Sequence, residues 1–148
     1  MSSLRKKIAL IAAASGLAVS TVALATPASA DVITGGGDRG LCQYRVCMSY
    51  NGGGEGAWFR SNYAEVTDLA GWEFGLGAFN NSNQWNGDGL PVKNAAAWIV
   101  NTGSQDIYVY VNSKAYGWGA YDVVYPGNAG DLQVTRNNEA SYSVNVYS

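Results

Sequence analysis

The sequence predicts an all-β fold built from two copies of one four-stranded unit, and three observations support this prediction. Apolar and polar residues alternate with a period of two in several short stretches, as in strands with one buried face. Glycine clusters and the Pro126-Gly127 step separate these stretches as turns. No segment carries a convincing 3.6-residue apolar period, which would indicate a helix. Two units of four strands suggest two Greek keys packed as a sandwich.

The first thirty residues have the pattern of an export signal. A basic patch at residues 5–7 precedes an apolar run at residues 8–25, and the small residues Ala28-Ser29-Ala30 follow as a cleavage site. We therefore expect residues 1–30 to be a signal peptide, residues 31–41 a flexible Gly-rich segment, and residues 42–148 one domain. No second apolar stretch approaches the roughly 20 residues that cross a bilayer, so we expect no membrane association after cleavage.

Charge and composition exclude several functions. Residues 31–148 keep six basic and eleven acidic side chains, a formal charge of −5, which argues against nucleic acids and anionic membranes as partners. The chain has no histidine, so Ser-His-Asp and Cys-His catalysis are excluded and the commonest zinc ligand is missing. No pair of carboxylates stands out by spacing. We expect an extracellular protein that is not an enzyme and that holds no metal or cofactor.

Cys42 and Cys47 are the two cysteines of the chain. In an exported protein, a lone close pair favours a disulfide over a redox motif or a metal site. We expect this bridge to pin the start of the first strand.

Two halves of the domain, at about residues 42–102 and 105–148, match each other at fixed offsets. At an offset of 63, the segment GAW at residues 56–58 matches GAY at 119–121, and Asp68-Leu69 matches Asp131-Leu132. At an offset of 44, VKNAAAWIVN at residues 92–101 matches RNNEASYSVN at 136–145. The change between the offsets predicts an insertion in the first copy, after Leu69. The alternative is two unrelated β-rich stretches of similar composition.

The clearest strands are expected at residues 107–111, 132–135 and 141–146. Ile107 and Val109 alternate with Tyr108 and Tyr110, so the tyrosines face solvent or a second layer. Leu132 and Val134 alternate with polar residues, and so do Tyr142, Val144 and Val146. We expect Glu55 and Asp122, which flank glycine turns, to be solvated.

The C-x4-C start, the Asp-Leu steps and the segments VKNAAAWIVN, PGNAGDL and RNNEAS together resemble the βγ-crystallin-like bacterial proteins. Within these, the chain is most similar to the secreted actinobacterial metalloproteinase inhibitors. The resemblance implies a crystallin-type sandwich and inhibition by an exposed reactive loop. It also implies a second disulfide that staples this loop, but the chain has no cysteine after Cys47, so no reactive-site residue can be transferred.

Crystallin-type domains that bind calcium carry two acidic or amide residues, two arbitrary residues, then Ser/Thr and Ser. NNEASY, from Asn137 to Tyr142, keeps the amides and Ser141 but has tyrosine at the last position, and the other copy starts with Lys93 and has no hydroxyl. Calcium needs six to eight oxygen ligands. We therefore favour the alternative that these polar residues cap a turn by bonding to backbone.

The insertion AGWEFGLGAFNNSNQWNGDGLPV, residues 70–92, is the candidate binding segment. Trp72 and Trp85, with Asp88 and neighbouring amides, suit a protease cleft or a sugar ring. In the alternative, these residues have only a structural role: Trp72, Phe74 and Phe79 close the core, and the NGDG segment at 86–89 is a tight turn.

The leading expectation is a secreted peptidase inhibitor that inserts a stiff loop into a protease. The alternatives are an extracellular carbohydrate- or cell-wall-binding module that uses Trp72 and Trp85, and a structural or toxin-like crystallin relative.

Overall fold

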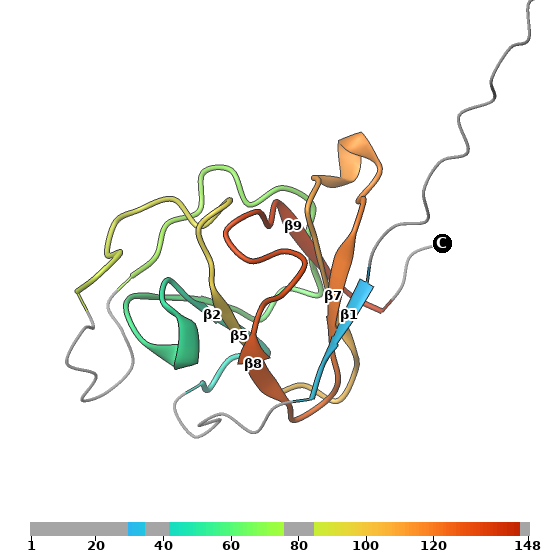
Figure 1. Ribbon diagram of the computed structural model, residues 1–148, viewed down its shortest axis with the longest axis horizontal. Coiled ribbons are helices and arrows are strands. Elements are labelled where there is room, and N and C mark those ends of the chain that lie inside the picture. The colour runs from blue at the N-terminus through green and yellow to red at the C-terminus, as the bar shows by residue number, and fades with distance from the viewer. Residues whose placement is uncertain (1–29, 35–41, 76–84, 146–148) are drawn as a thin grey trace, which may run out of the picture.

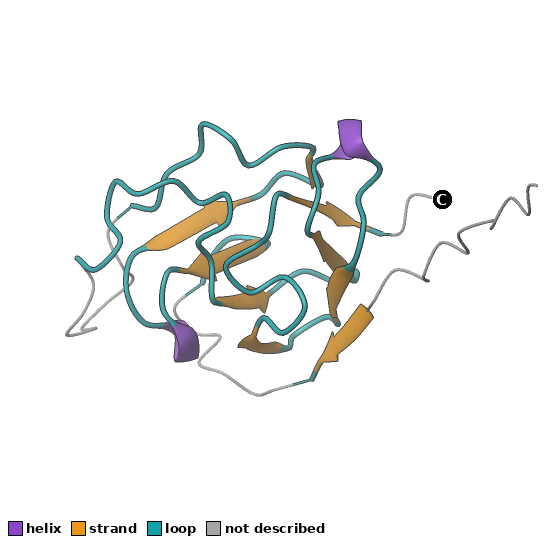
Figure 2. Ribbon diagram, turned by 45° about the horizontal axis from the view of Figure 1, so that its top comes forward, coloured by secondary structure: helices purple, strands orange, loops and turns teal. Residues whose placement is uncertain are grey.

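The computed structural model describes residues 30–34, 42–75 and 85–145, and the chain there forms two β-sheets (Figure 1). The strands are β1 (Ala30–Ile33), β2 (Val46–Ser49), β3 (Trp58–Ser61), β4 (Glu65–Val66), β5 (Trp98–Asn101), β6 (Ile107–Tyr110), β7 (Tyr121–Val124), β8 (Ala129–Asp131) and β9 (Ser141–Val144). Apart from two single 3-10 turns, η2 (Gly52–Gly54) and η3 (Lys114–Tyr116), the described residues contain no helix (Figure 2). The prediction of an all-β fold is confirmed.

Each sheet takes strands from both halves of the chain. The four-stranded sheet has the order β3-β2-β5-β8, and the five-stranded sheet has the order β1-β7-β6-β9-β4. The first half therefore contributes β4 to the sheet of the second half, and the second half contributes β8 to the sheet of the first. All pairs are antiparallel except β1 with β7. This strand exchange joins the halves through backbone hydrogen bonds as well as through the core.

One cluster of buried side chains combines residues from both sheets. Val46 and Met48 of β2 are fully buried in this cluster together with Ile107 and Val109 of β6. Tyr142 and Val144 of β9 join them, so the predicted alternation in residues 107–110 and 141–144 is confirmed, whereas Val146 lies outside the described residues. Burial of one such aliphatic side chain stabilises the fold by roughly 1.5–3 kcal/mol.

The prediction of a strand at residues 132–135 is wrong. β8 ends at Asp131, and the next residues bend because the buried carboxylate of Asp122 takes their backbone donors. The N–H groups of Gln133, Val134 and Thr135 donate to the two Asp122 oxygens at 3.2, 3.1 and 2.9 Å. Asp122 is 0% exposed, so the expectation that it is solvated is also wrong.

Paired hydrogen bonds relate the two halves in the loops before β5 and β9. Asn94 N donates to Glu139 O, and Asn137 N donates to Ala96 O, both at 2.8 Å. Asn94 and Asn137 also share a left-handed backbone, with φ of 63° and 55°. The equivalent positions are therefore 43 residues apart (137 − 94), one fewer than the offset expected from the sequence.

The N-terminal segment contributes an edge strand. Asp31 to Ile33, expected to be flexible, belong to β1 and pair in parallel with Asp122 to Val124 of β7. Ile33 is 5% exposed and joins the core, which accounts for the order of this short strand. Residues 35–41 lie outside the described residues.

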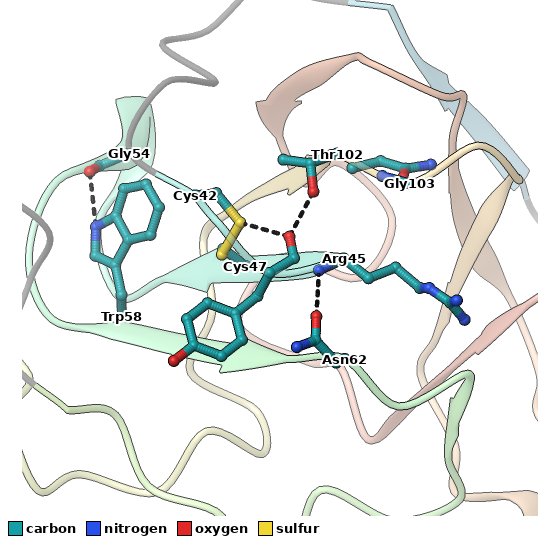
Figure 3. The surroundings of a disulfide bond; sticks show 10 residues. Cys42, Arg45, Cys47, Gly54, Trp58, Asn62, Thr102 and Gly103 are labelled. Carbon is teal, nitrogen blue, oxygen red and sulfur yellow. Dashed lines mark hydrogen bonds between the residues drawn. A yellow bond between two sulfur atoms is a disulfide. The ribbon is translucent and has the colours of Figure 1, made fainter.

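A disulfide joins Cys42 to Cys47, as predicted, with the Cα atoms 6.0 Å apart (Figure 3). Its loop is tied to the residues that directly follow β3 and β5, since Arg45 N donates to Asn62 Oδ1 at 2.9 Å and Thr102 Oγ1 donates to the Tyr44 carbonyl. Both cysteines belong to a second buried cluster, whose other members are Trp58, Trp98, Val100 and Ala129. The bridge therefore covers the outer face of the four-stranded sheet.

Removing the disulfide with the double variant Cys42→Ala/Cys47→Ala is expected to lower the free energy of unfolding by about 2 kcal/mol, because the bridge closes only a short loop in the unfolded chain. Urea unfolding of the variant and of the wild type measures this difference. Reduced wild-type protein is the matched control and should unfold at a midpoint close to that of the variant. An unchanged midpoint in the variant would contradict the expectation.

Candidate functional site

Residues 85–91 form an exposed turn whose backbone is held by neighbouring segments. Within the turn, Asp88 N donates to Trp85 O at 3.1 Å and Leu90 N donates to Gly87 O at 3.0 Å. Gly89 N and Leu90 O pair with the backbone of Phe74 at 2.8 and 2.9 Å. Phe74 is itself 1% exposed in the core, so the turn is anchored to a fixed residue.

Two further contacts fix the start of this turn. Ala57 N donates to Asn86 O at 2.8 Å. Gly87, at a φ of 91°, lies so close to the ring of Tyr50 that a Cβ atom there would come within 2.4 Å of the ring. Only glycine combines this backbone conformation with this close approach. The NGDG segment is thus a tight turn, and packing and hydrogen bonds hold it without a disulfide.

The side chains of the turn that face solvent include apolar and acidic groups beside the amide of Asn86. Trp85 is 64% exposed and Leu90 is 43% exposed. Asp88, between them in sequence, is exposed as well. A stiff backbone that presents an aromatic, an aliphatic and a carboxylate side chain has the features of a protein-binding loop.

Trp72, the third predicted binding residue, lies on the segment beside this turn, since Val92 N donates to Trp72 O at 2.9 Å. Its ring is half-buried and meets the edges of Phe59 and Tyr63, with centroids 5.4 and 5.9 Å apart. No ring contact joins Trp72 to Trp85 among the described residues. The structure therefore brings Trp85 and Asp88 together in one turn and places the Trp72 ring against Phe59 and Tyr63. Phe79 lies outside the described residues.

Trp72 and Tyr63 line a shallow groove of about 260 Å³ with both apolar and polar walls, which we call the Trp72 groove. Its lining residues are Tyr63, Glu65, Val66, Thr67, Asp68 and Trp72. Lys93 Nζ lies 2.8 Å from Asp68 Oδ1, and Lys114 Nζ lies 2.9 Å from Glu65 Oε1. The hydrogen bond from Lys93, aided by the N–H of Ala70, lowers the pKa of the Asp68 carboxyl. Each carboxylate of the groove thus has a lysine beside it.

Polar side chains of the segment from Asn137 to Ser141 form hydrogen bonds with backbone groups of other loops. Glu139 is 0% exposed, and its Oε1 accepts the backbone N–H groups of Ala95 at 2.8 Å and Ala96 at 2.7 Å. Ser141 Oγ donates to the Asn112 carbonyl at 2.5 Å. In residues 30–34, 42–75 and 85–145, no three acidic or cysteine side chains gather in a group that could hold a metal ion.

Burial is the main reason why the pKa of Glu139 rises to about 7, although nearby backbone N–H groups oppose the shift. The other carboxyl oxygen, Oε2, is buried and has no hydrogen-bond partner among the described residues. This carboxyl group is therefore protonated over much of the range in which ordinary glutamates are charged. The local sequence gives no signal of this burial, because it depends on the loop before β5.

Two exposed residues beside the predicted ones were also missed. Tyr63 is 61% exposed at the Trp72 groove, and Leu90 is exposed in the same turn as Trp85. Tyr63 stands in the polar run SNYAE, which gave no signal in the sequence. Leu90 follows the NGDG turn directly, so its exposure could have been inferred from the turn.

Comparison of the chain with known protein families, curated proteins and solved structures returned no match. Within the described residues, no helix is long and apolar enough to span a bilayer.

Proposed function

We propose that the protein is an exported, non-enzymatic relative of the βγ-crystallins that inhibits an extracellular peptidase through its 85–91 turn. The strand order supports the crystallin-type part of this proposal. In each half the fourth strand lies beside the first, β5 beside β2 and β9 beside β6, as in a Greek key. Each third strand, β4 or β8, crosses to the other sheet. The Cys42–Cys47 disulfide favours an oxidising compartment.

The stiffness of the 85–91 turn is the observation that carries the inhibitory function. A loop that is already ordered loses little conformational entropy when it enters a protease cleft, so more of the contact energy appears as affinity. In the related inhibitors a second disulfide provides this stiffness. In this chain the backbone pairing with Phe74 and Ala57 and the packing of Gly87 on Tyr50 take its place.

The exposed side chains of the turn favour a metallopeptidase as the target. Trp85 and Leu90 provide apolar groups for the pockets beside a scissile bond, and tryptophan is enriched among residues that dominate interface energies. Asp88 provides a carboxylate, a ligand type that a catalytic zinc with an open position accepts.

The test is inhibition of a zinc metallopeptidase of the thermolysin type and of a subtilisin-type serine protease by residues 31–148. We expect tight, stoichiometric inhibition of the metallopeptidase. Trp85→Ala is expected to raise the inhibition constant about 30-fold, the effect of losing a side chain worth roughly 2 kcal/mol. The melting temperature should not change, because Trp85 is mostly exposed.

Tyr116→Ala is the matched control, since Tyr116 is an aromatic residue that is 80% exposed on η3, outside the turn. Its inhibition constant should equal that of the wild type. Two results would reject the turn as the inhibitory site. One is absence of inhibition at about 10 μM protein, and the other is an equal rise of the inhibition constant in Trp85→Ala and Tyr116→Ala.

A further inference from the structure

The Trp72 groove is a second candidate binding site, on different side chains from the 85–91 turn. Tyr63 is 61% exposed, and its ring meets the Trp72 ring at an angle of 68°. Two aromatic rings at such an angle form a corner rather than a flat surface. The corner offers apolar ring surface on one side, and Glu65, Thr67 and Asp68 offer polar groups on the other.

The charges in this groove select the chemistry of the ligand. Glu65 and Asp68 each have a lysine partner, so the groove carries little excess charge of either sign. A nucleic acid or another polyanion would bring phosphates against two carboxylates, which is unfavourable. A purely apolar ligand would cover the carboxylates and Thr67 without bonding to them, which costs desolvation energy. A neutral ligand with an apolar face and several hydroxyl groups satisfies both kinds of surface.

Lys114 links one wall of the groove to aromatic side chains of the second half of the chain. Lys114, which lies 2.9 Å from Glu65, has its Nζ 5.6 Å from the centre of the Trp118 ring. Trp118 packs on Tyr110 at 4.4 Å, and Tyr110 packs on Tyr121 at 5.8 Å. We call the rings of Trp118 and Tyr121 the aromatic strip; the Tyr110 ring between them is only 4% exposed. Trp118 and Tyr121 are half-buried, so part of each ring remains accessible beside the groove.

We propose that the Trp72 groove binds one neutral sugar ring of an extracellular polysaccharide and that the aromatic strip contacts the following units of the same chain. The apolar face of a pyranose stacks on Tyr63 and Trp72. Its hydroxyl groups donate to Glu65 and Asp68 and accept from the lysines that flank them. Since Trp85 takes no part, this binding is independent of the proposed peptidase inhibition.

The test is affinity electrophoresis of residues 31–148 in gels that contain a soluble β-glucan, xylan, mannan or glycol chitin, followed by titration of tryptophan fluorescence with oligosaccharides of the glycan that binds. We expect at least one polysaccharide to retard the wild type. Tyr63→Ala is expected to weaken binding about tenfold, the loss of one stacked ring. The melting temperature of this variant checks its folding, and it should match that of the wild type because Tyr63 is exposed.

Trp118→Ala tests the aromatic strip. Wild-type affinity should rise from the monosaccharide to the tetrasaccharide, and this rise should be lost in Trp118→Ala while monosaccharide binding is kept. Trp85→Ala is the matched control and should bind as the wild type does, whereas Tyr63→Ala should keep any inhibition of the peptidase. Retardation by none of the four polysaccharides, or unchanged binding in Tyr63→Ala, would overturn the proposal, and either result would leave the inhibitory turn untouched.

Discussion

Between pH 4.5 and 7 the free energy of unfolding is expected to fall by about 3 kcal/mol, because Glu139 is easier to deprotonate in the unfolded chain than in the folded protein. Burial raises the pKa of this carboxyl from 4.5 to about 7 in the folded state. In this window the folded state keeps the proton and the unfolded state has lost it, so each rise in pH favours unfolding. Above pH 7 both states are deprotonated and the loss is complete.

Glu139→Gln is the variant that tests this effect. A glutamine Oε1 can accept the N–H groups of Ala95 and Ala96 as the carboxyl does, but it carries no titrating proton. The variant should therefore be more stable than the wild type at pH 8 and should lack the decline between pH 4.5 and 7. Urea unfolding at several pH values, with Glu73→Gln at an exposed position as control, measures the difference. A decline of equal size in Glu139→Gln and the wild type would show that another group causes it.

Asp122→Ala is expected to lower the free energy of unfolding by about 4 kcal/mol, among the largest effects of any single substitution. The fully buried Asp122 carboxylate accepts three backbone N–H groups from residues 133–135 and the hydroxyl of Thr135 at 2.6 Å. Alanine would remove all four bonds and leave the three N–H groups without their acceptor. Hydrogen bonds to a charged acceptor are stronger than those to a neutral one.

Thr135→Val is the matched control for this prediction, because it removes only the hydroxyl and keeps the shape of the side chain. We expect a loss of about 1 kcal/mol, the usual value for one hydrogen bond. Thermal and urea unfolding of both variants at pH 7 measure the two effects. A loss below 1 kcal/mol in Asp122→Ala would show that water replaces the carboxylate.

Local patterns in the sequence predicted the local structure well. The alternation of Ile107 and Val109 with tyrosines, the bridge between Cys42 and Cys47, and the tight NGDG turn are all found in the structure. Each depends on residues close together in the chain, where side-chain period, loop length and turn chemistry decide the conformation.

Features that depend on distant residues were not predicted correctly. The offset of 44 gave better matches of residue type, but hydrogen bonds between Asn94 and Glu139 and between Asn137 and Ala96 require 43. The sequence around Asp122 predicted a surface residue beside a turn, whereas the backbone of residues 133–135 bonds to its carboxylate. The position of the Trp72 ring has the same origin, since Phe59 and Tyr63, from the segment β3–β4, contact it.

The exchange of β4 and β8 between the two sheets determines what a proteolytic cut between the halves does to the folded molecule. The link between the halves, residues 102–106, is short and lies between β5 and β6. A single cut there would leave β4 hydrogen-bonded to β9 and β8 to β5, so the two fragments would remain one particle. Two domains joined end to end would separate after the same cut. The inhibition proposed above would require the protein to act in the presence of proteases, and an interlocked architecture lets a nicked molecule keep its shape.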